Sequence, residues 1–296
     1  MRSSLQRPRE IHDATMWNNA LRTKSLVREC NALGSHRAWH CSKSPLDIVA
    51  TRNFDRFARP SMKSKIVRIN SNMCVSCGMR GRSLFADLQS DDFALIDQPI
   101  HDLQFEPQET MFQEGAPGAF LFTVRSGIVK LVRFQSDGTQ RIVRLLTSGD
   151  VAGLETSAGA NFDSTAIALT RVSACRIPRA VIERLEAASP RLHTQLLRKW
   201  HEALKQSGDF ISELATGNAR QRLARLLLRL SQGDPTQGVL LPSREDVGAM
   251  LGVTTETASR AVAAFRREGL LRSLDRQGKH FVVDVAALQA LADGRK

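Results

Sequence analysis

The stretch that decides the fold covers residues 243–271 and reads SREDVGAMLGVTTETASRAVAAFRREGLL. Ser243 is suited to cap a first helix, and Asp246 stands where a capping box has its acidic partner. A glycine ends this helix, and Thr254 or Thr255 can cap a second one. The pattern therefore predicts two short helices joined by a tight turn.

The second helix divides into an apolar face and a polar face. Glu256, Ser259 and Arg260 are spaced i, i+3 and i+4, so they share one side of the helix. A helix fits the major groove of DNA, where Arg can bind guanine, Glu can accept from cytosine, and Ser can serve either way. These three side chains are therefore the candidate base contacts. A solvated surface helix is the alternative explanation of the same pattern.

Three neighbouring residues complete the candidate DNA contacts, because they lie at the starts of the two helices: Thr254, Thr255 and Arg244. Beyond the second helix, residues 270–283 read as strand, turn and strand, with Asp-Arg-Gln-Gly at 275–278 as the turn. A basic hairpin in this place is typical of a wing, which favours DNA binding over the alternative.

Length and composition bound the class of protein. The chain has 296 residues, 42% of them hydrophobic, and no apolar run near the roughly 18 residues of a membrane helix. The N-terminus lacks the apolar core of a signal peptide. Five widely spaced cysteines do not indicate a disulfide scaffold. We therefore expect a cytoplasmic protein with two packed domains and no membrane contact.

The net charge of +12 is unevenly distributed, with +9 in residues 1–70, −2 in residues 71–213 and +5 in residues 214–296. The basic C-terminal part suits phosphate contacts, but most of the excess lies in a tail without hydrophobic periodicity. We expect residues 1–70 to form a basic, mostly disordered extension. It is either an arm that adds non-specific DNA affinity or sequence ahead of the true start, at Met62 or Met73.

Residues 71–188 read as a small β domain, in which glycines separate short β-type segments. Ser-Asp-Gly-Thr at 136–139 is typical of a hairpin turn. The expected strands are residues 110–113, 120–125, 128–134, 140–145, 164–169 and 174–177. Six short strands at this spacing predict a barrel or roll.

A long helix is predicted for residues 189–214, with Ser189 as its cap and Pro190 in the first turn. Its apolar positions alternate between spacings of three and four, which is typical of a coiled-coil seam. They are Leu197, Trp200, Leu204, Ser207, Ile211 and Leu214. We expect this seam to form a parallel homodimer, and a helix packed on its own roll is the alternative. An arginine-rich helix at 219–230 opens the last domain, residues 215–296.

In this order, a β-roll, a long helix and a winged helix-turn-helix resemble the CRP/FNR superfamily of bacterial transcription regulators. The most specific motifs are GNARQRLA at 217–224 and ETASR at 256–260, of which the second is similar to the FNR branch. The resemblance implies an α+β fold: an N-terminal cyclic-nucleotide-binding-type β-roll, a dimerisation helix and a C-terminal winged helix-turn-helix. It also implies a dimer that binds double-stranded DNA at sites like TTGAT-N4-ATCAA and contacts RNA polymerase.

The same resemblance implies an iron–sulfur sensor. In the FNR branch, cysteines near the N-terminus and one in the roll hold a [4Fe–4S] cluster, and Cys74, Cys77 and Cys175 match three of these metal ligands. The fourth is missing, although a cubane cluster normally takes four thiolates. The residues that could complete the set are Asp87, Ser83, Cys41 and Cys30. Otherwise the thiols are a relic, a zinc site lacking a ligand or a dithiol switch, and Cys175 a small buried apolar residue.

A cyclic nucleotide is the less favoured ligand. Members of the superfamily that bind one have Arg-Ser/Thr-Ala after the Gly-Glu of the roll, whereas this chain has GDVAGLE at 149–155 and FDSTA at 162–166. The arginine is absent, and Asp163 would repel a phosphate.

The sequence does not indicate an enzyme. It has no Ser-His-Asp order, no phosphate loop and no carboxylate pair in a glycine-rich pocket. The predicted function is a dimeric, sequence-specific transcription regulator whose roll senses redox state, oxygen or a small ligand. The alternative is a cytoplasmic ligand-binding or scaffold module without specific DNA contact.

Overall fold

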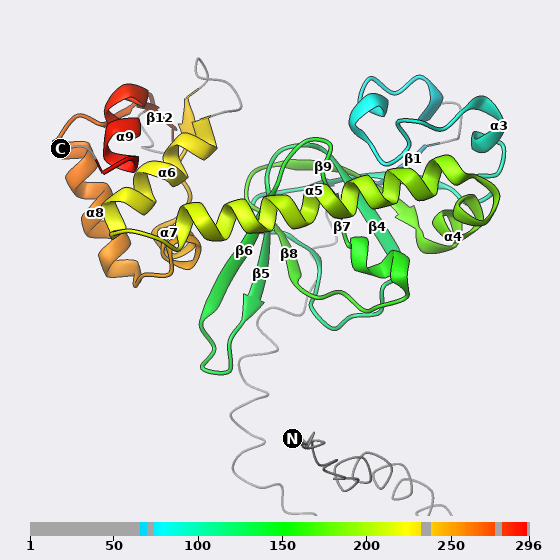
Figure 1. Cartoon of the computed structure of the whole chain (residues 1–296), viewed down its shortest axis with the longest axis horizontal. Helices are drawn as coiled ribbons and strands as arrows, with labels where there is room; N and C mark the ends of the chain where they lie inside the picture. Colours follow the sequence, from blue (N-terminus) through cyan, green and yellow to red (C-terminus); the bar gives the residue numbers. More distant parts are fainter. Residues whose placement is uncertain (1–65, 70–73, 232–237, 276–279, 295–296) are drawn as a thin grey trace, which may run out of the picture. The chain divides into compact units, whose positions relative to one another are not determined.

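The N-terminal part of the fold is a roll made of two antiparallel sheets. The computed structural model describes residues 66–69, 74–231, 238–275 and 280–294, coloured along the sequence in Figure 1. One sheet has the strand order β1-β2-β9-β4-β7 and the other β3-β8-β5-β6. The strands are β1 (Ile66–Ile69), β2 (Ile100–Phe105), β3 (Thr110–Phe112), β4 (Phe120–Ser126), β5 (Val129–Phe134), β6 (Gln140–Leu146), β7 (Val151–Ala152), β8 (Thr165–Ala168) and β9 (Val172–Pro178).

All six segments that the sequence predicted as strands are strands in the roll. β1, β2 and β7 were not predicted. β1 pairs antiparallel with β2, from Ile66 opposite Leu103 to Ile69 opposite Ile100. The roll therefore includes residues that lie before its expected boundary at residue 71. The rest of the expected N-terminal extension, including Cys30, Cys41 and Met62, lies outside the described residues.

The hairpin of β5 and β6 has the turn that its sequence predicts. Gly138 adopts a φ of 81°, which a residue with a Cβ rarely does. The backbone N–H of Gln135 donates to the carbonyl of Thr139 at 2.9 Å. This hairpin carries the side chains by which the roll meets the C-terminal domain.

Two apolar clusters stabilise the roll. The interior between the sheets is filled by aromatic and aliphatic side chains, among them Leu103, Phe105, Phe112, Phe122, Leu131, Leu146 and Phe162. The second cluster joins the roll to the segment that follows η1 (Arg80–Arg82), to the short helix α3 (Ser90–Phe93), and to α4 (Arg179–Ala188) and α5 (Pro190–Leu214). Its members include Leu84, Phe85, Leu88, Phe93, Leu185 and Leu192. η2 (Leu154–Ala158) closes the loop after β7.

α5 is the long helix expected after the roll, and it begins at Pro190 as predicted. Ser189 takes the predicted N-cap position, although its hydroxyl makes no capping hydrogen bond. α4 was not predicted, because its ten residues follow directly on β9 without a capping side chain. Among the described residues, no helix is both long and apolar enough to cross a bilayer.

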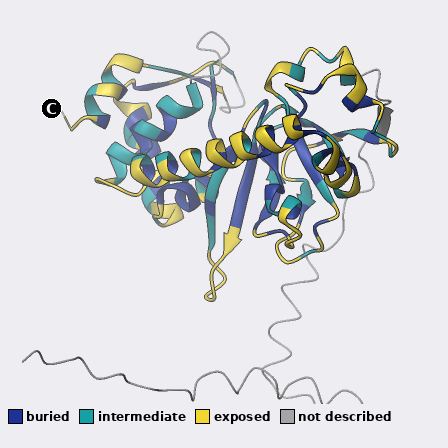
Figure 2. Cartoon of the chain, turned by 45° about the vertical axis from the view of Figure 1, so that its right-hand side comes forward, coloured by how far each residue is buried: buried dark blue, intermediate teal, exposed yellow. Residues whose placement is uncertain are grey.

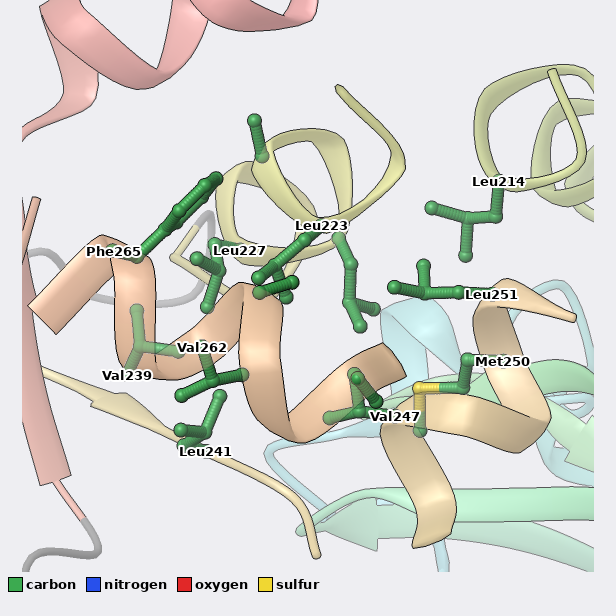
Figure 3. Packing of buried hydrophobic residues seen from close by; sticks show 14 of the residues in the cluster. Leu214, Leu223, Leu227, Val239, Leu241, Val247, Met250, Leu251, Val262 and Phe265 are labelled. Carbon is green, nitrogen blue, oxygen red and sulfur yellow. The ribbon is translucent and has the colours of Figure 1, made fainter. Parts of the chain in front are cut away.

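The C-terminal domain has its own elements: α6 (Ala219–Ser231), β10 (Val239–Leu240), α7 (Arg244–Leu251), α8 (Thr255–Arg267), β11 (Leu271–Ser273), β12 (His280–Val283) and α9 (Val285–Ala292). Figure 3 shows how the apolar side chains of α6, α7 and α8 point toward one another, with Leu214 of α5 beside them. Phe265 and Leu223 are fully buried in this cluster. The same cluster includes Val132, Ile142 and Leu145 of the roll, so the two domains share one core.

Candidate nucleic-acid interface and cysteine cluster

α7 and α8 form the predicted pair of helices joined by a turn. The Ser243 hydroxyl accepts from the backbone N–H of Asp246 at 3.0 Å, and the Thr254 hydroxyl accepts from that of Thr257 at 3.2 Å. Gly252 ends α7 with a φ of 65°. The capping box is not completed, because the Asp246 carboxylate turns away from Ser243 toward the roll.

The polar face of α8 lies on the surface. Glu256, Ser259 and Arg260 are all exposed, whereas the opposite face is buried through Ala258, Ala261, Val262 and Phe265. Glu256 and Arg260 form an i,i+4 ion pair, and their side chains are 72% and 75% exposed. Thr254 and Thr255 are exposed at the start of the same helix. The structure therefore brings five of the six predicted contacts together on one accessible helix end.

Arg244, the sixth predicted contact, is in a different setting at the first residue of α7. It is half-buried. Burial is the main cause that lowers the pKa of its guanidinium, and the nearby charge of Arg266 lowers it further. Arg266 itself lies over the ring of Phe281, 5.7 Å from its centroid. Arg244 and Arg266 thus concentrate positive charge at the last turn of α8.

The strands of the predicted wing are present, and a third strand joins them. The order in the sheet is β10-β12-β11, with Ser273 opposite Phe281. The Asp275 carboxylate accepts from the backbone N–H of His280 at 3.1 Å, which ties the two ends of the turn together. The turn residues 276–279 lie outside the described residues.

The arginines of α6 serve the fold of the domain. Arg220 forms a two-pronged ion pair with Glu268 at 2.6 and 2.7 Å, and Arg229 pairs with Glu213. The Arg222 guanidinium donates to the Leu251 carbonyl at 2.6 Å. Local spacing in the sequence does not predict these roles, because every partner comes from another element.

α5 presents an apolar stripe to solvent, visible as exposed residues along this helix in Figure 2. Four of the six predicted seam positions form it, with exposed fractions of 58% at Leu197, 40% at Trp200, 74% at Leu204 and 63% at Ile211. Leu214 is wrong as a seam residue, because it packs in the core shared with the C-terminal domain. Leu192, Leu196, Ala203 and Phe210 face the chain's own domains.

The cysteines lie at one side of the roll. Cys74 and Cys175 both pack against the cluster that joins the roll to α4 and α5. Burial raises the pKa of Cys74 to about 11 and the pKa of Cys175 to about 12. The negative charge that Cys77 would carry as a thiolate adds to both shifts, so the three thiols share one neighbourhood. Burial in an apolar environment holds Cys74 and Cys175 as neutral thiols at neutral pH.

The described residues do not fit a four-ligand cluster. The Ser83 hydroxyl donates to the Arg80 carbonyl at 2.9 Å and accepts from the Phe85 backbone N–H at 3.1 Å, so it closes a local turn. Asp87 pairs with Arg198 at 2.7 Å. Within the described ranges, no three His, Cys, Asp or Glu side chains are arranged to hold a metal ion. The role of Cys74, Cys77 and Cys175 as metal ligands therefore stays a prediction.

The interior of the roll is apolar. The rings of Phe112 and Phe162 stack with their centroids 3.9 Å apart, and Phe122 packs on Phe112 at 5.6 Å. In the stretch that the resemblance compares with a phosphate contact, Glu155 of η2 accepts from the backbone N–H of Asp163 at 3.2 Å. Two carboxylates therefore lie in this loop, which disfavours an anionic ligand.

Two family models match the chain, one for each domain. Residues 102–189 match the cyclic nucleotide-binding domain, and residues 221–291 match the Crp-like helix-turn-helix domain. The first match covers most of the roll, and the second covers α6 to α9.

Named relatives and solved structures agree with these models. The chain is 30% identical over 227 residues to the fumarate and nitrate reduction regulatory protein of Salmonella typhi, which covers 74% of this chain and 90% of that protein. It is 27% identical over 217 residues to electron transport regulator A of Shewanella oneidensis, covering 71% and 86%. The structure of FixK2 from Bradyrhizobium japonicum is similar with a TM-score of 0.57 and 26% identity, covering 64% of this chain and 96% of that one.

Proposed function

The chain belongs to the FNR-like branch of the CRP/FNR superfamily of transcription regulators, and from that premise we propose that it acts as a homodimer whose two α8 helices read a two-fold DNA site. The observation that carries this proposal is the polar start of α8. Glu256, Ser259 and Arg260 are exposed there and have no packing role, while the opposite face of the helix is held by a buried core. A helix N-terminus presented in this way suits the major groove.

Each residue of the reader has a proposed role. Arg260 binds guanine O6 and N7, Glu256 accepts from a cytosine amino group, and Ser259 donates to a neighbouring base. Thr254 and Thr255 bind the phosphates beside them. The guanidinium of Arg244 also binds a phosphate. By likeness to the FNR branch, the site is TTGAT-N4-ATCAA. RNA polymerase is the proposed partner at the promoter, and the cytoplasm is the proposed location.

The exposed stripe of α5 supports the dimer. Leu197, Trp200, Leu204 and Ile211 recur along one face of the helix and leave large apolar side chains in water. Burial of an apolar side chain contributes about 1.5–3 kcal/mol relative to its exposure, so pairing two such stripes is favourable. A symmetric pair of helices also sets the two readers a fixed distance apart.

We propose the roll as the sensor of redox state, oxygen or a small ligand. Cys74 and Cys175 pack against the same cluster as Leu192 and Leu196 of α5, so a change at the thiols can reach the dimer helix. Iron–sulfur chemistry requires a donor beyond those in the described residues. A cyclic nucleotide is disfavoured by the phenylalanine-filled interior and by Glu155 and Asp163.

The test is a binding titration of the full chain against TTGAT-N4-ATCAA and against a scrambled duplex of equal composition. We expect the two-fold site to bind about 10³-fold tighter or more, with two chains per duplex. Equal affinity for both duplexes would reject the proposal. It would leave the ligand-binding or scaffold module as the better description of the protein.

A further inference from the structure

A buried ion pair joins the roll to the first helix of the DNA reader. Nζ of Lys130 in β5 lies 2.5 Å from Oδ1 of Asp246 in α7, and the two side chains are only 4% and 2% exposed. Taking two charges out of water costs more than burying an apolar pair of similar size. Stability alone therefore does not explain the pair. A charged hydrogen bond adds direction, because it is satisfied in only one relative position of the two domains.

The roll side of this pair is held by a strained residue. Oε1 of Gln108 accepts from the Lys130 ammonium at 3.2 Å. Gln108 has a φ of 70°, and it is the only non-glycine residue with a positive φ among those the structure describes. It follows Pro107 in a turn closed by a 3.0 Å hydrogen bond from the Glu109 N–H to the Glu106 carbonyl. Glycine is the usual residue at this turn position, and only a residue with a side chain can reach Lys130.

The reader side is fixed at two consecutive residues. The backbone N–H of Asp246 is bound by the cap at Ser243, while its carboxylate points out of the helix to Lys130. The preceding residue, Glu245, accepts from Nε2 of Gln140 in β6 at 2.9 Å. Both strands of the β5–β6 hairpin are therefore bonded to the first turn of α7. α8 is held in a fixed position relative to α7, because Val247 and Met250 of α7 share a core with Val262 of α8.

We propose that Lys130 is a positioning residue for the DNA reader. With Gln108 behind it and Asp246 in front, it sets the orientation in which α7, and with it α8, is held against the roll. The inference rests on the proposed two-fold DNA binding. In a dimer, this orientation sets how the two α8 helices are spaced and turned, so affinity depends sharply on the separation of the half-sites.

The experiment compares DNA duplexes whose half-sites are separated by three, four or five base pairs. One base pair turns a half-site by about 35° around the duplex. The variant is Lys130→Met/Asp246→Leu in the full chain, which removes both charges together and leaves no unpaired buried charge. Lys205→Met/Asp209→Leu is the matched control, because that pair has the same chemistry on the exposed face of α5.

We expect the Lys130→Met/Asp246→Leu variant to unfold at or near the wild-type temperature. Its preference for the four-base-pair spacing should fall by about fivefold or more, the size of coupling usual between contacting residues. The control keeps the wild-type preference. Gln108→Gly suits the turn and so keeps the fold, and it should show a smaller loss in the same direction.

Three outcomes overturn the proposal: an unchanged spacing preference in both the double variant and Gln108→Gly, an equal change in affinity at all three spacings, or the same loss in the control. If the wild-type chain itself shows no preference for two-fold DNA, the proposed function fails separately. Amide hydrogen exchange then tests the positioning role alone. We expect faster exchange in α7 but not in α9 of the double variant, and equal exchange rates in wild type and variant contradict the role.

Discussion

Glu256 and Arg260 hold each other one helical turn apart on the free reader helix. Both side chains are largely exposed, so their ion pair contributes only about 0.3–0.5 kcal/mol to stability. The pair is therefore easily exchanged for contacts to bases. Until then it keeps the guanidinium and the carboxylate extended on the same face, which lowers the entropy lost on binding.

Arg260→Ala tests this role at the level of one residue. We expect a loss of about 1–3 kcal/mol in discrimination between the two-fold site and a site with the paired guanine replaced. The thermal stability should hardly change. Arg179→Ala is the matched control, because Arg179 forms an i,i+4 pair with Glu183 on α4. Competition titrations with both variants measure the effect, and equal discrimination in wild type and Arg260→Ala speaks against base contact.

The thiols allow a prediction of pH dependence. The pKa of Cys74 is raised to about 11 and that of Cys175 to about 12, mainly by burial. A raised pKa keeps a thiol neutral, so its reactive thiolate appears only as the pH approaches these values. In chelator-treated protein at pH 8, alkylation of both residues should be about 10²-fold slower than for an exposed cysteine. Residue-resolved mass spectrometry measures the rates, and unfolded protein is the control. Rapid labelling of folded Cys74 at pH 8 contradicts the burial argument.

Ser83 is one of the candidate positions for a fourth ligand beside the three cysteines. Its hydroxyl closes a turn of the chain, and Asp87 is paired with Arg198. Because the described residues offer three thiols, we expect the anaerobically purified wild-type chain to contain less than stoichiometric iron and sulfide. Ser83→Cys should raise both, and Ser83→Ala is the matched control. Four irons and four sulfides per wild-type chain would mean that a donor outside the described residues completes the site.

At the scale of elements, helices with a strong apolar period and capping residues could be predicted from the sequence. α5, α7 and α8 follow from that pattern, and Ser243 and Thr254 cap their helices as expected. β1, β7 and β10 are two to four residues long and carry no period. α4 follows β9 at once without a capping side chain, whereas α9 has a local signal in Asp284, whose side chain accepts from the Ala287 N–H.

Partners from distant elements could not be predicted from local spacing. Asp246 looks like half of a capping box, yet its carboxylate binds Lys130, which is 116 residues away in the sequence. Leu214 fits the period of the seam, yet it lies in the shared core because α6 and α7 cover it. Periodicity tells which face of a helix is apolar, but not which partner covers each end of that face.

The stripe on α5 gives the prediction for an element. Leu204 is 74% exposed, so Leu204→Glu should leave the fold of one chain intact while placing two like charges face to face in the dimer. We expect sedimentation analysis to show monomers, and affinity for the two-fold site to drop. Val285→Glu places the same charge on an exposed apolar residue of α9 and should leave the dimer unchanged. A dimer that persists in Leu204→Glu rejects this helix as the interface.

One hydrophobic core extends across the boundary between the roll and the C-terminal domain. Val132, Ile142 and Leu145 come from the roll, yet they belong to the cluster that contains Leu223 and Phe265 of the reader. For the signal that we propose the roll to sense, this contact is a physical route to the DNA-binding helices. Most of the net positive charge lies outside this shared core, in residues 1–70. Electrostatic steering toward DNA and orientation on DNA are therefore separate properties of the chain.

Leu145→Ala tests whether this shared core makes the two domains unfold together. Truncating a buried leucine costs about 2–5 kcal/mol, and for a chain of this size each kcal/mol lowers the midpoint by roughly 2–4 °C. Leu145→Ala removes contacts at the junction, whereas Leu103→Ala removes them inside the roll. If the domains are one cooperative unit, calorimetry shows a single transition, and both variants lower it. Amide exchange in α8 then rises in step with exchange in β4, because opening either domain opens the other. The opposite result would be two transitions, with Leu103→Ala lowering only the transition of the roll. The roll and the reader would then fold independently, and a contact this weak could not transmit the proposed signal from the roll to the reader.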